Sequence, residues 1–205
     1  MSIGLALVGL AAVFYITAYN MFIQMLTQRL GGSIQDPLQL WEALQTIDLL
    51  PIRTRAWIFS KIVGLANPYA RTIDFRITEL RKGKACGVMK QSKINSNPFQ
   101  RVHEAALITF GETVGSLAFL TLLNHTTDIA VLTNINADYV KVSKGLLTAS
   151  SVIPPFKDRE ATELITHVLI KNASFETVAQ LTLTWKVDLL GASHTHTIPA
   201  AIPSK

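Results

Sequence analysis

The hydrophobic and polar positions of this 205-residue chain follow different periods in different stretches, and each period predicts an element. Residues 3–23 are almost entirely apolar, with Thr17 and Asn20 as strongly polar interruptions, and the first charged residue is Arg29. A helix of about 20 apolar residues spans the hydrocarbon core of a bilayer. We therefore predict that residues 1–30 form a single membrane-anchoring helix; a helix buried against protein is the alternative interpretation.

The next stretch, residues 31–70, predicts a linker of two short amphipathic helices. Asp36 followed by Pro37 supplies a capping side chain and a first-turn proline, which together mark the start of a helix. Pro51 separates this helix from a second one, in which apolar residues recur at helical spacing with Arg53 among them. Two interpretations are open for the linker: it lies on an anionic lipid surface, or it packs on the folded body.

Alternation of apolar and polar residues over 71–80 predicts a half-buried strand, and a shorter strand is predicted at 85–90. Further strands are predicted at 128–135, 138–144, 146–153, 163–171 and 175–190. Between these groups, residues 103–123 are apolar on nearly every face of a helix, with Glu112 at the centre. Such a helix must be buried, and a carboxylate in mid-bilayer costs at least about 3 kcal/mol, so a protein core is favoured.

The predicted order is therefore a strand pair, one buried helix and then an antiparallel run of strands. An antiparallel sheet wrapped around a single apolar helix satisfies all of these burial requirements. We predict an α+β fold for residues 71–190, followed by a tail at residues 191–205.

Composition and charge narrow the functional classes. Hydrophobic residues make up 49% of the chain and charged residues 16%, which excludes a disordered polar chain. Cys86 is the only cysteine, so an internal disulfide and a thiolate metal cluster are both excluded. The net charge of +5 suits an anionic partner, and because no nucleic-acid motif occurs we expect membrane lipid and not nucleic acid. We expect the protein at a membrane, with the mitochondrial inner membrane as the favoured location.

One segment carries a family resemblance. Residues 97–105 read Asn-Pro-Phe-Gln-Arg-Val-His-Glu-Ala, and Glu112 follows nine residues after the histidine. This resembles the Asn-Pro-Phe-Gly-x-Val-His-Gly-Gly pattern of phenylacetyl-CoA thioesterases, which have the hotdog fold, and it is closer still to an uncharacterised thioesterase-like branch of that superfamily. The resemblance covers roughly residues 67–190. It implies a hotdog fold and a dimer, formed either by two copies or with a related hotdog chain.

The resemblance also implies roles for individual residues. Glu112 would be the general base or nucleophile, Asn97 would hold water or substrate, and His103 would line the site. Backbone amides where the loop enters the helix would polarise the thioester carbonyl. The positions implied for substrate binding are Phe99, Glu104, Ala105 and Thr113. An acyl thioester such as acyl-CoA is the implied ligand, and no cofactor or metal is expected.

The sequence departs from the pattern where the family has glycines. Gln100, Glu104 and Ala105 occupy those positions, and their side chains narrow the space in which a ligand approaches the backbone. For this reason we favour a non-catalytic accessory subunit of a membrane complex, such as a respiratory or ATP synthase complex. The alternative is an active acyl-CoA thioesterase with Glu112 as base.

Overall fold

The computed structural model describes residues 36–48, 50–156 and 162–189, together with positions 10, 13–18, 20, 21 and 24. Most of the predicted anchor at residues 1–30 and the whole predicted tail at 191–205 lie outside the described residues. Within the described part of the chain, no helix is both long enough and apolar enough to cross a membrane. The anchor therefore stays a prediction.

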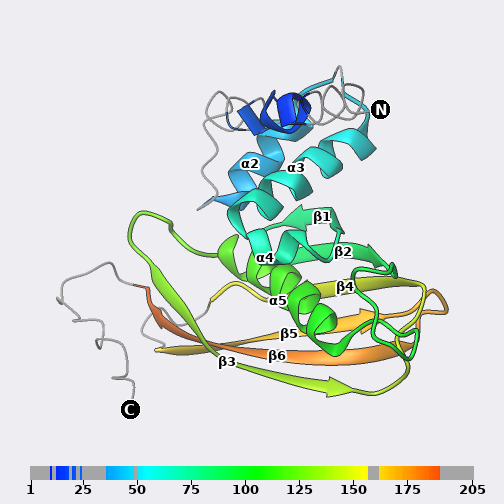
Figure 1. Ribbon diagram of the computed structural model, residues 1–205. Helices are drawn as coiled ribbons and strands as arrows, with labels where there is room; N and C mark the ends of the chain where they lie inside the picture. The colour runs from blue at the N-terminus through cyan, green and yellow to red at the C-terminus, as the bar shows by residue number, and fades with distance from the viewer. Residues whose placement is uncertain are drawn as a thin grey trace, which may run out of the picture.

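The body is a six-stranded sheet in which every neighbouring pair is antiparallel, in the order β1-β2-β4-β5-β6-β3 (Figure 1). The strands are β1 (Phe75–Arg81), β2 (Lys84–Lys90), β3 (Ile129–Tyr139), β4 (Leu146–Val152), β5 (Glu163–Lys171) and β6 (Thr177–Asp188). The tight β5–β6 connection begins at Asn172, whose side-chain oxygen accepts hydrogen bonds from the amides of Ser174 and Glu176. The α+β class and the antiparallel sheet are thus confirmed.

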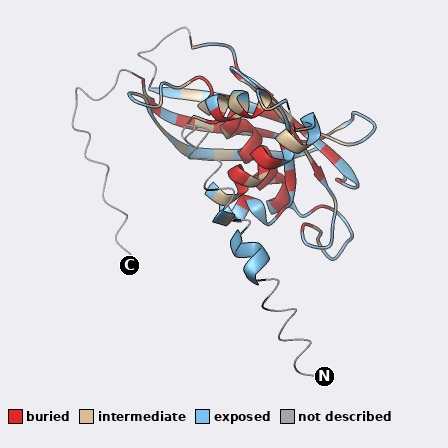
Figure 2. Cartoon of the chain, turned by 90° about the horizontal axis from the view of Figure 1, so that it is seen from above, coloured by how far each residue is buried: buried red, intermediate tan, exposed pale blue. Residues whose placement is uncertain are grey.

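The predicted central helix is α5 (Glu104–Leu120), and it lies against one face of the sheet (Figure 1). Two glycines allow the close approach: a Cβ on Gly111 would lie 2.6 Å from a methyl carbon of Leu181, and one on Gly115 would lie 2.5 Å from Leu183. Figure 2 shows the buried residues gathered in the centre of the molecule, where helix and sheet meet. Because the helix is enclosed on most sides, its sequence can be apolar on nearly every face.

The linker helices are α2 (Pro37–Gln45), α3 (Ile52–Ala66) and the short α4 (Pro68–Arg71). Asp36 caps α2 as expected, since its carboxylate accepts a 2.9 Å hydrogen bond from the amide of Gln39. Helix α3 packs on β1, where the amide of Ile77 donates a 2.8 Å hydrogen bond to the buried hydroxyl of Ser60. Of the two interpretations of the linker, packing on the folded body is confirmed.

One strand prediction was wrong. Residues 128–135 and 138–144 do not form two strands, because β3 runs unbroken from Ile129 to Tyr139 and residues 140–145 are irregular. The polar residues that suggested a break pair with β6 instead, with Asn136 opposite Thr182. Only a bulge between Leu132 and Asn134 interrupts the ladder. As a result the sheet ends in a long edge strand.

Candidate active site

Glu112 lies in the middle of α5 and is half-buried. The hydroxyl of Ser116 donates a 2.7 Å hydrogen bond to its Oε1. Burial raises the pKa of the Glu112 carboxyl, and hydrogen bonds from Ser116 and Thr113 offset part of the rise. A carboxylate with a raised pKa accepts protons more readily near neutral pH, which is the property that a general base needs.

The position of Glu112 on α5 follows from helical spacing. Ile108, Glu112, Ser116 and Leu120 are four residues apart and form one half-buried stripe, whereas Phe110 and most other residues of the helix are buried in the core. Thr113 is buried, and its hydroxyl donates to the carbonyl of Thr109. The half-buried stripe is the side of α5 from which a ligand or a second chain can reach the carboxylate.

The first turn of α5 is capped by His103. Its Nδ1 accepts a 3.0 Å hydrogen bond from the amide of Ala105, and its carbonyl accepts from Leu107. The Ala105 amide is therefore occupied, whereas the amide of Glu104 has no acceptor among the described residues. Because the amino end of a helix carries partial positive charge, the Glu104 N–H is the open donor for an oxyanion.

Asn97 organises the loop before α5. Its side-chain oxygen accepts hydrogen bonds from the amides of Phe99 at 3.1 Å and Arg101 at 3.2 Å. Between them, Gln100 has a φ of 56°, a left-handed conformation that glycine adopts without steric penalty. The backbone that the family builds with glycine is thus retained here with a glutamine. Phe99 is 78% exposed, and its role in substrate binding stays a prediction.

Asn95 was missed by sequence reasoning. It is 2% exposed, and its side-chain amide donates to the carbonyls of Ile73 at 3.2 Å and Lys90 at 3.0 Å. Its side-chain oxygen accepts from Ser92, and its own carbonyl accepts from the amide of His103. Asn95 therefore fixes the loop to both strands of the first hairpin and sets where α5 begins. No local pattern signals this role, because its partners are distant along the chain.

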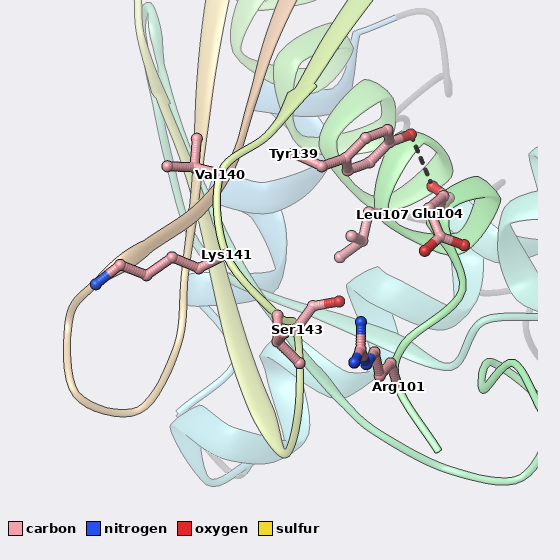
Figure 3. Close-up of a pocket in the computed structure, with 8 residues that line it drawn as sticks. Arg101, Glu104, Leu107, Tyr139, Val140, Lys141 and Ser143 are labelled. Carbon is pink, nitrogen blue, oxygen red and sulfur yellow. Dashed lines mark hydrogen bonds between the residues drawn. The ribbon is translucent and has the colours of Figure 1, made fainter. Parts of the chain in front are cut away.

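A cavity of about 330 Å³ opens beside the first turn of α5. Its lining residues are Arg101, Glu104, Leu107, Tyr139, Val140, Lys141, Val142 and Ser143. Figure 3 shows Arg101, Glu104 and Ser143 directed toward the same space, with the hydroxyl of Tyr139 donating a 3.4 Å hydrogen bond to the carbonyl of Glu104. Lys141 points away and pairs with Glu176 at 2.6 Å.

The structure brings Asn97, His103 and the Glu104 amide together at one end of α5, but it does not bring Glu112 to them. Eight residues of helix separate Glu104 from Glu112, which corresponds to about 12 Å along the axis. Hydrogen bonds require heavy-atom distances near 3 Å, so one thioester group cannot contact both sites in a single chain. A complete site needs a second source of one of these groups.

Comparison with known proteins matches the fold. Among solved structures, a structural-genomics protein of unstated function superposes with a TM-score of 0.62 at 17% identity, over 73% of this chain and 98% of that one. A thioesterase of Staphylococcus aureus gives 0.51 at 24% identity, over 58% of this chain and 96% of its own. The PaaI protein from the phenylacetic acid degradation operon of Escherichia coli gives 0.52 at 18% identity, over 69% and 99%.

Sequence comparison gives the family. No curated protein matches the sequence. The family model described as a domain of unknown function, DUF4442, matches residues 55–187, which is more than half of the chain. The chain therefore belongs to the DUF4442 family and, by its fold, to the hotdog-fold, thioesterase-like superfamily.

Proposed function

We propose that this protein hydrolyses acyl thioesters such as acyl-CoA, with Glu112 as the general base. The observation that carries the proposal is the state of Glu112: a half-buried carboxyl with a raised pKa, hydrogen-bonded to Ser116 on an otherwise apolar helix. A structural helix has no need of such a group, because burying a carboxyl costs free energy unless its charge is used or compensated.

The chemistry requires two groups. Glu112 takes a proton from a water molecule as the water oxygen bonds to the thioester carbonyl carbon. The Glu104 amide stabilises the negative charge that develops on the carbonyl oxygen. The carbon–sulfur bond then breaks, and the proton passes from Glu112 to the departing thiolate. The products are a carboxylic acid and a thiol.

A second copy of the chain supplies the missing proximity. Strand β3 lies at the edge of the sheet with one row of backbone groups unpaired among the described residues, and Ile129 and Val131 on it are 56% and 57% exposed. A long apolar edge strand of this kind is a template for pairing with another chain. Two copies joined along β3 would place antiparallel α5 helices so that Glu112 of each approaches the first turn of the other.

The accessory-subunit interpretation is the less favoured candidate. It was based on the glycines replaced by Glu104 and Ala105, yet the open Glu104 amide and the retained loop conformation at Gln100 preserve the features that a thioesterase needs. The structural relatives named above include thioesterases and offer no support for an accessory role.

We also propose that residues 1–30 attach the protein to a membrane. The described positions in this stretch are helical and carry exposed apolar side chains such as Phe14 and Tyr15. Flotation of the full chain with lipid vesicles, compared with a variant lacking residues 1–30, tests this attachment. Equal recovery of the two proteins with the vesicles would contradict it.

Hydrolysis itself is tested with the full chain purified in mild detergent and acyl-CoA substrates of several chain lengths. Glu112→Gln keeps the shape of the side chain and removes the base, and we expect turnover to fall about 10²–10⁴-fold. Glu163→Gln changes an exposed carboxylate on β5 and serves as the matched control. Hydrolysis that is equally fast in wild type and Glu112→Gln would refute the assignment, and so would absence of turnover in the wild type.

A further inference from the structure

Two loops meet at the end of β2 through Gln91. Its amide donates a 2.7 Å hydrogen bond to the carbonyl of Gly145, and its side-chain oxygen accepts a 2.9 Å bond from the Gly145 amide. The side-chain nitrogen of Gln91 also donates to the carbonyl of Gln100 at 3.0 Å. The loop before α5 and the loop after β3 are therefore held against each other at a defined place.

Basic side chains surround this junction. Lys90 precedes Gln91, Lys144 precedes Gly145, and Arg101 follows Gln100, so each is next to a residue of the hydrogen-bonded junction. We call Lys90, Arg101 and Lys144 the basic rim. All three are exposed, and none has an ion-pair partner among the described residues. Like charges brought together without acidic partners favour an anionic ligand.

The cavity connects the basic rim to the first turn of α5. Arg101 belongs to both, since it lines the cavity and flanks the junction. The cavity wall alternates polar and apolar groups: Arg101 offers donors, Glu104 offers an acceptor, and Leu107 and Val142 offer apolar surface. A chain of amides separated by methylene groups matches such a wall, because its carbonyls, N–H groups and carbons each find a suitable neighbour.

We propose that the cavity and the basic rim bind the phosphopantetheine arm that carries the acyl group. The amide-containing arm lies in the cavity, and its phosphate rests on the basic rim. The thioester end reaches the first turn of α5. This inference rests on the proposed thioester hydrolysis, and it assigns residues that the hydrolytic step does not use. Phosphopantetheine occurs in both coenzyme A and acyl carrier proteins, so the shared arm is the chemistry recognised.

The test is equilibrium binding to the full chain in mild detergent, measured by calorimetry. The probes are pantetheine, 4′-phosphopantetheine, coenzyme A and a holo-acyl carrier protein. We expect the phosphorylated arm to bind at least about tenfold more tightly than pantetheine, which is the factor for one hydrogen bond to a charged group. Whichever of coenzyme A and the carrier protein binds more tightly identifies the source of the arm.

Substitutions locate the site. Arg101→Gln and Lys144→Gln should each weaken binding of 4′-phosphopantetheine about tenfold while leaving binding of the unphosphorylated arm much less affected. Lys82→Gln removes the same charge at the opposite end of the β1–β2 hairpin and should leave binding unchanged. Equal affinity for pantetheine and its phosphate would overturn the proposal. Rim variants that bind as the wild type does would overturn it too.

Failure of this inference is distinguishable from failure of the proposed function. An acyl N-acetylcysteamine thioester has a thioester but neither the full arm nor the phosphate. Glu112-dependent hydrolysis of that substrate without any preference for the phosphorylated arm would sustain the hydrolase and overturn the arm site. Tight, rim-dependent binding of the arm without hydrolysis of any thioester would sustain the arm site and overturn the hydrolase.

Discussion

The hydroxyl of Ser116 donates a 2.7 Å hydrogen bond to Oε1 of Glu112 from one turn further along α5. A hydrogen bond to the ionised carboxylate lowers its pKa, whereas burial raises it, and burial is the larger effect. Ser116 therefore helps to keep Glu112 ionised at a pH where a carboxyl in the same apolar setting would hold its proton. The relationship gives the site a measurable pH dependence.

Ser116→Ala should move the rising limb of the hydrolysis rate to higher pH. Removing the hydrogen bond leaves burial opposed only by Thr113, so the Glu112 pKa rises further and the basic form is populated later. The measurement is kcat/KM against pH for wild type and variant. A limb that stays in place, or moves to lower pH, would be incompatible with Glu112 as the base.

Stability should show the same ionisation with the opposite sign. A carboxyl whose pKa is raised in the folded state binds its proton more tightly there than in the unfolded chain. Ionisation of Glu112 therefore lowers the free energy of unfolding as pH rises from the ordinary glutamate pKa through the raised one. In Glu112→Gln this loss should disappear, and urea unfolding at several pH values measures the difference between the two proteins.

Glu104→Pro removes the proposed oxyanion donor selectively. Glu104 is the first residue of α5, where proline is well tolerated, and His103 before it has the extended backbone that proline requires (φ −64°, ψ 140°). We expect turnover to fall about 10²–10³-fold with little change in thermal stability. Glu104→Gln keeps the amide and should retain hydrolysis. Full activity in the proline variant would exclude this N–H as a donor.

Val131→Lys should separate the two copies. Lysine on an edge strand opposes pairing with another chain, and β3 is the exposed edge of the sheet. Analytical ultracentrifugation should show a monomer, and hydrolysis should be lost because the site is shared. Ile165→Lys places the same charge at an exposed position of the interior strand β5 and should remain dimeric. A monomeric yet active Val131→Lys protein would argue for a site within one chain.

Gln100→Gly should stabilise the fold by about 0.5 kcal/mol. Relief of the left-handed conformation gains about 1–2 kcal/mol, and the greater freedom of glycine in the unfolded chain offsets roughly half of that. Gln180→Gly on β6 lacks a positive φ, so the same change there should destabilise. Urea unfolding measures both. Destabilisation by Gln100→Gly would mean that the glutamine side chain contributes contacts beyond those described.

The fold was predictable wherever one period dominated the sequence. Helix α5 stood out because it is apolar on nearly every side, and β1 because its residues alternate. The prediction failed at β3, where a bulge between Leu132 and Asn134 shifts the alternation and exposed polar residues imitate a turn. Pairing with β6 decides that strand, and a tertiary ladder leaves no local period to read.

The site was predictable only in part for the same reason. Glu112 was conspicuous as the lone charge on an apolar helix, whereas Asn95 looked like any polar loop residue. Its partners Ile73 and Lys90 lie 22 and 5 positions earlier in the chain. The capping bond from the Ala105 amide to His103 was also hidden, since it depends on the side-chain conformation of the histidine. Such roles arise from three-dimensional packing.

The central claim, a hydrolytic site shared by two copies with Glu112 as base, is tested most directly with mixed dimers. Glu112→Gln lacks the base in every subunit, and Glu104→Pro lacks the amide donor, so each homodimer should be nearly inactive. A dimer purified with one subunit of each kind keeps one site with both groups intact, and we predict about half of the wild-type turnover per dimer. Mixed dimers as inactive as either parent would contradict the claim.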